Sequence, residues 1–482
     1  MTKRSKYSFI ASFFLFLTLA AWSVSSPIGS GVDADFHLGS IWCARGETKG
    51  LCESIDTSTQ TATVPYMFQM CDGRNIYFWP KCEIASENYS TQSIRIANDK
   101  QQSVYYWTTH LFASENVNSS VLLIRLFNSL LASLVFFALL ALSSDRLRKA
   151  IVISWTLTLI PNGIQLLSGI NPRSWAVLGI MSSWAFLQAF LTENPRNRHK
   201  RYWQLGLYLG SIALTASARF DSLLFVCFVS AVILVSHFVD FESHLYKRTV
   251  AVAGISVLAV LALRSNPRLN DILSFSVPST FSAPQYFMFE LIHIPEFVAH
   301  WWGFSASQQE NVPGIIGLVG VSLFAVFMYE ILRGADRRQV LAVSTLTIFT
   351  LLALFRATSS IGALIPLTGV YTFGLVAPII GVAVVHSKNT VNRLTSSKMR
   401  SLVVALVGSI HLLTFYGWIE FFTRRGVNTQ FFDTFSLTGT WWWNSSVNPN
   451  VIFGMGSLAF FAFLLFAWKS LEISSLDAPE YL

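Results

Sequence analysis

The sequence predicts an all-α polytopic membrane protein with about twelve transmembrane helices. Asp, Glu, Lys and Arg make up only 12% of the 482 residues, whereas a typical soluble domain carries about 25% charged residues. Hydrophobic residues make up 52% of the chain, and mostly apolar runs recur at about the 20-residue length that spans a bilayer. Disordered chains and nucleic-acid-binding tails need dense charge, so the composition excludes both and indicates no nucleic-acid partner.

The apolar runs are rich in Leu, Val, Ile, Phe and Ala and lack the alternating pattern of transmembrane β-strands. We expect each run to form one helix of a single membrane-embedded domain, residues 1–482, without internal repeats. The runs lie near residues 7–26, 120–142, 150–168, 174–192, 203–219, 222–239, 249–264, 313–332, 339–355, 366–386, 401–419 and 450–468.

Basic residues predict the orientation, because cytoplasmic loops carry an excess of Lys and Arg. Most of the 34 basic residues lie at the N-terminus and in alternate linkers, so both termini are expected in the cytoplasm of a cell-membrane protein. The net charge of +8 is therefore mostly a topology signal. We expect the first run to stay as an anchor; a cleaved secretory signal is the alternative.

This orientation leaves three longer segments on the outer face. They are residues 27–118, residues 265–312 with a predicted interfacial helix, and residues 420–449. Candidate chemistry gathers in the first of these loops and at the outer ends of the spans.

Four of the five cysteines, Cys43, Cys52, Cys71 and Cys82, lie in the first outer loop. Cysteines in an exported loop favour disulfides, here two bridges with three alternative pairings. The bridges would staple a loop too polar to build its own core. Zinc is the competing interpretation, but the spacing contains no C-x-x-C pair. Cys227 lies within a span and is expected to be a packing residue.

Asp33, Asp35 and His37 follow the first span within five residues. A carboxylate held at a membrane surface can act as a general base or bind a cation. In a helix, Asp33 and His37 would share one face because they are four residues apart. The structural alternative is that Asp33 caps a short interfacial helix beginning near Ala34.

Several arginines break the positive-inside pattern because they lie near the outer ends of spans. Charged groups at membrane depth are costly and usually face a cavity or a partner, and the planar guanidinium binds oxyanions with two hydrogen bonds. We expect an outward-facing anion-binding cavity, with snorkelling to lipid headgroups as the alternative. The arginines are Arg125, Arg173, Arg219, Arg264, Arg268 and Arg356.

Tyr105 and Tyr106 belong to an aromatic stretch just before the second span. Tyr and Trp are common at membrane interfaces, so an aromatic belt is one interpretation. The other interpretation is a wall that contacts a sugar or a lipid headgroup.

Taken in chain order, these features resemble the GT-C type of membrane glycosyltransferases. More narrowly, the chain resembles a bacterial multi-pass family of uncharacterised membrane proteins of that fold. The motif Asp33-Ala-Asp35-Phe-His37 follows the first span, where that family tends to have D-E-x-x-H. Tyr105-Tyr106 precedes a span that contains Arg125, and Asn171-Pro172 forms a turn between two spans.

The chain also departs from the pattern of that narrower family. Asp35 stands one place later than the second acid of its motif, and Arg173 follows Asn-Pro where an acid is common. The late arginine-tyrosine signature is represented only by Tyr371. The resemblance therefore rests on several short motifs in order and carries no information on the substrate.

The resemblance implies a glycosyltransferase on the extracytoplasmic face. It would move a sugar from a polyprenyl-phosphate donor to a cell-envelope glycan or lipid acceptor, with inversion. The resemblance specifies no certain cofactor, and use of a divalent cation stays open. Asp33 is the expected base, with Asp35 as the second candidate, and His37 would orient that base. Arg173, Arg219 and Arg356 would bind the phosphate. The expected substrate contacts are Tyr105, Tyr106, Arg125 and Asn171.

A polytopic transporter or flippase for lipids or solutes is the alternative function, because it would have the same span count. It predicts inverted repeats and helices broken by Gly or Pro at corresponding positions of two halves. The sequence shows no such symmetry, and its unusual charges lie at the outer surface rather than at the midplane. A non-catalytic envelope scaffold is the third hypothesis.

Overall fold

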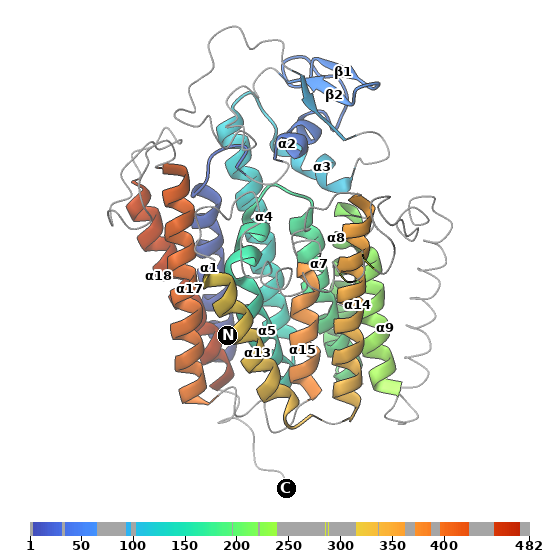
Figure 1. Ribbon diagram of the computed structural model, residues 1–482, viewed down its shortest axis with the longest axis vertical. Coiled ribbons are helices and arrows are strands. Elements are labelled where there is room, and N and C mark those ends of the chain that lie inside the picture. Colours follow the sequence, from blue (N-terminus) through green and yellow to red (C-terminus); the bar gives the residue numbers. More distant parts are fainter. Residues whose placement is uncertain are drawn as a thin grey trace.

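The protein is described from a computed structural model that covers residues 3–30, 34–64, 93–97, 103–194, 196–219, 222–238, 285, 288, 315–335, 337–361, 372–386, 396–423 and 448–472. These residues form a bundle of long helices. A small sheet and two short helices gather beyond one end of the bundle (Figure 1).

Most of the described chain is helical, as the apolar runs predict, because a spanning segment must satisfy its own backbone polar groups in lipid. The helices before residue 240 are α1 (Lys3–Val24), α2 (Ala34–Trp42), α3 (Val104–Thr109), η3 (His110–Phe112), α4 (Val117–Leu142), α5 (Asp145–Thr158), η4 (Leu159–Gly163), α6 (Ile164–Ser168), α7 (Arg173–Thr192), α8 (Arg198–Ala218) and α9 (Leu223–Phe238). Those after residue 310 are α13 (Ile315–Leu332), α14 (Arg337–Ile361), η7 (Phe373–Leu375), α15 (Val376–His386), α17 (Ser397–Thr423) and α18 (Pro449–Glu472).

By length and composition, five of the described helices could cross a membrane: α1, α4, α7, α17 and α18. The pair α5 and α6 makes a sixth span if the two helices count as one. The prediction of a multi-pass membrane protein is confirmed at this level. The predicted segment 249–264 lies outside the described residues, as do nearly all of the outer loop 265–312 and most of the loop 420–449.

The pair α5 and α6 bends by 91°. The bend contains a short π-helical stretch, η4, with Pro161 and Gly163 in it. Proline removes a backbone donor and obstructs the preceding turn, which accounts for a sharp break at this place. The break brings polar residues of η4 and α6 to the end of the bundle where the first outer loop lies.

Helices α1 and α18 pack antiparallel along their length. Tyr7 near the start of α1 stacks on Phe466 near the end of α18, and Gly456 at the start of α18 lies beside Ala21 at the end of α1. Arg4 forms an ion pair with Asp145 at the start of α5. The start of α1 and the end of α18 therefore lie at the same end of the bundle as the basic linker before α5. The first outer loop lies at the opposite end.

The first outer loop contains a small antiparallel sheet that the all-α prediction did not include. Its strands are β1 (Ser54–Asp56), β2 (Thr61–Thr63) and β3 (Ser93–Arg95), in the order β1-β2-β3. Ala62 at the centre of β2 is buried and joins a second hydrophobic core with Leu38 and Trp42 of α2. The loop therefore folds against the bundle through α2.

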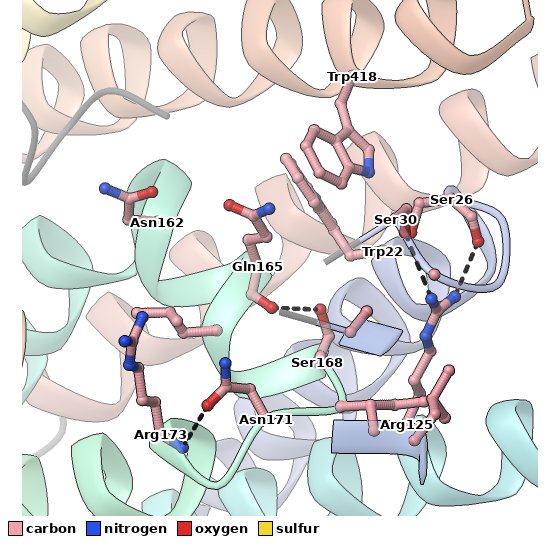
Figure 2. A pocket seen from close by; sticks show the side chains of 16 residues that line it. Trp22, Ser26, Ser30, Arg125, Asn162, Gln165, Ser168, Asn171, Arg173 and Trp418 are labelled. Atoms are coloured by element: carbon pink, nitrogen blue, oxygen red, sulfur yellow. Dashed lines mark hydrogen bonds between the residues drawn. The ribbon is translucent and has the colours of Figure 1, made fainter. Parts of the chain in front are cut away.

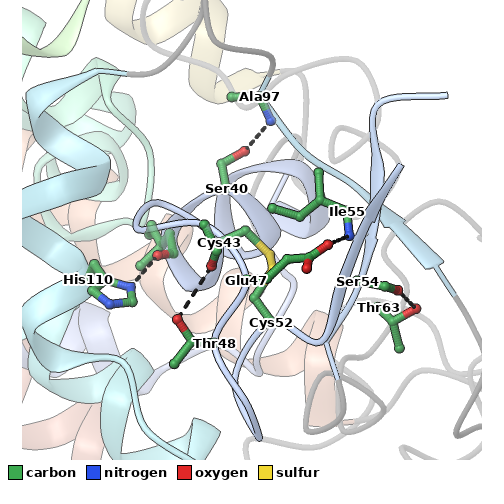
Figure 3. The surroundings of a disulfide bond; sticks show 12 residues. Ser40, Cys43, Glu47, Thr48, Cys52, Ser54, Ile55, Thr63, Ala97 and His110 are labelled. Carbon is green, nitrogen blue, oxygen red and sulfur yellow. Dashed lines mark hydrogen bonds between the residues drawn. A yellow bond between two sulfur atoms is a disulfide. The ribbon is translucent and has the colours of Figure 1, made fainter. Parts of the chain in front are cut away.

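A disulfide joins Cys43 to Cys52 (Figure 3). This bond confirms the prediction of a disulfide in the loop. Of the three alternative pairings, it agrees with the one that joins Cys43 to Cys52. Cys71 and Cys82 lie outside the described residues. Cys227 is a free buried thiol, as expected for a packing residue.

Helices α7 and α8 approach closely through a glycine. A Cβ atom added at Gly179 would lie 2.6 Å from the backbone oxygen of Ser211 on α8. The hydroxyls of Ser182 and Ser211 are 2.9 Å apart and share a hydrogen bond across the same interface. Small residues allow membrane helices to pack backbone to backbone, and this contact holds α7 and α8 together.

We predict that Gly179→Ala lowers the free energy of unfolding by about 1–3 kcal/mol, because the added methyl group must push the two backbones apart. Thermal unfolding of the detergent-solubilised protein measures the effect. The matched control is Gly206→Ala on α8, where an added Cβ would have no neighbour within 4 Å. The control should be neutral or slightly stabilising, and equal effects at the two positions would contradict the prediction.

Candidate functional site

Helix α2 places His37 against the aromatic helix α3. The helix begins at Ala34, the start predicted for a helix capped at Asp33. His37 Nδ1 and the Tyr106 hydroxyl are 2.9 Å apart and share a hydrogen bond. Tyr106 is buried, so the first motif and the aromatic stretch form one cluster.

The aromatic residues of helix α3 are partly buried in the protein and partly exposed. Tyr105 and Tyr106 face inward, whereas Trp107 is 49% exposed. Burial raises the pKa of Tyr105 well above its ordinary value, so this phenol stays neutral. The two tyrosines therefore belong to the interior of the site, and Trp107 has the exposure expected of an interfacial aromatic.

Three arginines from different elements act electrostatically on His37. Arg173 begins α7, Arg219 follows the last turn of α8, and Arg95 ends β3. Burial holds the pKa of His37 well below its usual 6.5, and the positive charges of Arg173, Arg219 and Arg95 lower it further. The imidazole is therefore neutral at neutral pH and lies in a positive field.

A cavity of about 70 Å³ opens where the α1–α2 turn, α2, α4, the α5–α6 bend and α7 meet (Figure 2). Its polar lining includes the predicted residues Arg125, Asn171 and Arg173, together with Asn162 and Gln165 from the bend. The Arg173 backbone N–H donates to Asn171 Oδ1 at 2.9 Å, which orders the start of α7.

Arg125 holds the turn that links α1 to α2. Its guanidinium donates to the backbone oxygens of Ser23 and Ser26 at 2.8 Å and of Pro27 at 2.9 Å. The side chain of Ser30 accepts a further bond at 3.4 Å. Arg125 is only 5% exposed, so these contacts assign it to the cavity wall rather than to a freely accessible cationic surface.

Asn128, one turn further along α4, holds the second turn that borders the cavity. Its amide nitrogen donates to the backbone oxygen of Gly169 at 2.8 Å and to the Tyr105 hydroxyl at 3.3 Å. Its oxygen accepts from Trp175 Nε1 at 2.9 Å. Asn128 therefore fixes the turn that carries Asn171, yet the sequence marks it only as one polar residue in an apolar span.

The remaining wall of the cavity is aromatic. Trp22 and Trp418 lie with ring centroids 6.0 Å apart, and Figure 2 shows the two indoles beside each other. Trp22 Nε1–H donates to Nε2 of the buried His411 at 3.1 Å. Sequence reasoning missed Trp22, Trp418 and His411, because each stands alone within an apolar run.

Several predicted site residues are not placed at the level of side chains. Asp33 lies outside the described residues, and for Asp35 in α2 and Arg356 in α14 only the helical backbone is described. Within the described part of the chain, no three His, Cys, Asp or Glu side chains gather as a metal ion would require. The site that can be described is therefore His37 with Tyr106, the surrounding arginines and the adjoining cavity.

The bundle, its apolar helices and the folded outer loop define a multi-pass membrane protein. Residues 15–298, more than half of the chain, match a family described as Predicted membrane protein (DUF2142), and the chain belongs to this family. The match includes the first outer loop, the cavity lining up to Arg173 and the outer turn at Arg219. No curated protein and no solved structure matches the chain.

We predict that Arg125→Lys destabilises the protein by about 1–3 kcal/mol, because one ammonium group cannot reach all the buried carbonyl oxygens that the guanidinium binds. Thermal unfolding in detergent measures the loss. Arg45→Lys is the control, because Arg45 is exposed on the first loop. An unchanged melting temperature for Arg125→Lys would show that the turn does not depend on this clamp.

We also predict that acidification weakens the fold through His37. At pH values between the lowered pKa of His37 in the folded protein and its ordinary 6.5, the unfolded chain binds a proton at His37 that the folded protein does not. The free energy of unfolding therefore falls as the pH drops below 6.5, by at most about 1.4 kcal/mol per pH unit. Melting temperatures at about pH 7.5 and pH 5.5 test this.

His37→Gln should reduce that pH dependence, because the amide can still bond to Tyr106 but does not titrate. His199→Gln, at an exposed position on α8, should retain the full dependence. Identical pH profiles for the wild type and His37→Gln would assign the acid sensitivity to other groups.

Proposed function

We propose that the protein is a GT-C-type membrane glycosyltransferase that uses a polyprenyl-phosphate sugar donor on the extracytoplasmic face. One observation carries the proposal: His37 of the first outer loop lies in the electrostatic field of Arg173 and Arg219, beside a cavity that Arg173 lines. This places the His37 end of the acidic motif near two arginines suited to phosphate, which supports the proposal.

In the proposed reaction, Asp33 accepts the proton of an acceptor hydroxyl, with Asp35 as the second candidate. The resulting oxygen nucleophile attacks the anomeric carbon of the donor sugar from the side opposite the phosphate. The bond from that carbon to the phosphate oxygen breaks, and the configuration inverts. General-base assistance contributes about 10²–10⁴-fold to such a rate.

The arginines would act on the leaving phosphate. Negative charge builds on its oxygens as the sugar departs, and fixed cations in a site with little water stabilise that charge. Arg173 and Arg219 are the described candidates, and Arg356 is a further candidate from α14. His37, neutral and bonded to Tyr106, would orient the base rather than supply a positive charge.

The cavity is the place we assign to the phosphate of the donor, because Arg173 lines it. The sugar and the acceptor would then lie toward the first loop. The proposed donor would reach this position from the outer leaflet of the bilayer.

The proposal includes the finer topology expected from the sequence. It requires about twelve spans, both termini in the cytoplasm and the first loop outside. The disulfide supports an extracytoplasmic first loop, because such bonds persist in oxidising compartments. The antiparallel packing of α1 and α18 is consistent with two termini on one side.

A transporter or flippase for an anionic lipid or solute is the second candidate function. The 91° bend between α5 and α6 favours it, because broken helices whose polar residues reach a cavity are common in transporters. A transporter would need no base in the first loop. The two functions therefore differ in their dependence on Asp33.

We predict that Asp33→Asn abolishes sugar transfer while expression and membrane insertion stay normal, because the amide cannot accept the proton. The measurement is sugar analysis of envelope glycans in a strain that lacks the protein and is complemented with each variant. Wild type should restore the missing sugar, and Glu115→Gln is a control at an exposed outer carboxylate. Full restoration by Asp33→Asn would remove the proposed base and favour transport.

A further inference from the structure

Strand β3 packs unusually close to α2. A Cβ atom added at Gly39 of α2 would lie 2.9 Å from the backbone oxygen of Arg95 and 2.8 Å from Ile94 Cδ1. The backbone N–H of Ala97 donates to Ser40 Oγ at 2.8 Å, directly after the strand (Figure 3). The missing side chain at Gly39 and the hydroxyl of Ser40 therefore fix the register of β3 on α2.

This packing sets the position of the Arg95 side chain. Its guanidinium carbon lies 5.8 Å from the centre of the Phe36 ring, within reach of a cation–π contact. Phe36 directly precedes His37, on which the charge of Arg95 also acts. Arg95 is exposed, whereas Arg173 is buried at the start of α7. The loop thus brings an exposed cation beside the residue that precedes His37.

The disulfide ties the sheet to the same helix. Cys43 follows the last residue of α2, and Cys52 lies two residues before β1. Inside the closed loop, Glu47 Oε1 accepts from the backbone N–H of Ile55 in β1 at 2.9 Å. The backbone N–H of Ile96 after β3 donates to the Gln60 oxygen at 2.9 Å. The sheet is therefore attached to α2 at two places: by the packing of β3 and by the loop that the disulfide closes.

We propose that Arg95 is a further ligand-binding residue of this site, carried by the loop sheet and contacting the phosphate group of a lipid phosphate together with Arg173 and Arg219. The inference rests on the proposed function and adds a residue that the membrane helices do not supply. Arginine suits this role because its planar fork presents paired donors to phosphate oxygens. An exposed guanidinium would meet the phosphate before it reaches Arg173, which is buried.

The test uses the full-length protein in phosphatidylcholine nanodiscs, with radiolabelled farnesyl phosphate as the probe. Arg95→Gln should raise the dissociation constant roughly tenfold, the effect of losing a charge-assisted hydrogen bond. Arg95→Lys should lie between wild type and Arg95→Gln, because it keeps the charge but not the fork. Arg45→Gln removes an exposed charge from the same loop and should leave binding unchanged.

A second measurement reports the position of Arg95 relative to His37 without any ligand. The pKa of His37, measured by hydrogen–deuterium exchange at its C2 carbon with mass spectrometry, should rise in Arg95→Gln because a nearby positive charge is lost. It should change little in Arg95→Lys and in Arg45→Gln. An unchanged His37 pKa in Arg95→Gln would place Arg95 away from the site and overturn the inference.

The binding outcomes separate this inference from the proposed function. If wild type binds farnesyl phosphate and Arg95→Gln binds it equally well, the role of Arg95 is wrong and the proposed function stands. If farnesol competes as well as farnesyl phosphate, phosphate is not recognised and both fail. If inorganic phosphate competes as well as farnesyl phosphate, Arg95 binds a phosphate anion, but the claim that the ligand is a lipid phosphate is wrong.

Discussion

One turn of helix α4 organises the two walls of the cavity. The helices α1 and α6 both end inside the protein, where backbone carbonyl groups have no helical partner and little access to water. Buried carbonyls need hydrogen-bond donors, most strictly in a membrane. Arg125 supplies them to the turn after α1, and Asn128 supplies one to the turn after α6. Because the two residues are three positions apart, one helical turn sets the distance between the walls.

The cationic cluster depends on this frame. Asn128 and the Asn171 side chain order the turn that precedes Arg173, and the close contact at Gly179 brings the end of α8, with Arg219, beside the start of α7. Like charges repel, so packing must hold them together. In their field and under burial His37 stays neutral, which leaves its hydrogen bond to Tyr106 as the interaction that orients it.

Sequence reasoning identified several residues of the site but not their roles. His37, Tyr106, Arg173 and Arg219 were each selected from local patterns, and the structure brings them together. Arg125 was selected as an anion-binding residue, but its nitrogens bind backbone oxygens of a turn 98–102 positions away in the chain. Arg95 gave no signal, because a single arginine in a polar loop is unremarkable until the loop folds onto α2.

The sequence by itself determined that this chain is a multi-pass membrane protein with a disulfide in the loop after its first span. Those properties follow from composition, from the length of apolar runs and from the compartment of cysteines, which are local and additive quantities. Only the tertiary structure decided which cations face His37, which residues clamp the cavity and which cysteine pairs with Cys43. These depend on contacts between segments distant in the chain, and burial and mutual charge acquire values only when those segments are packed together.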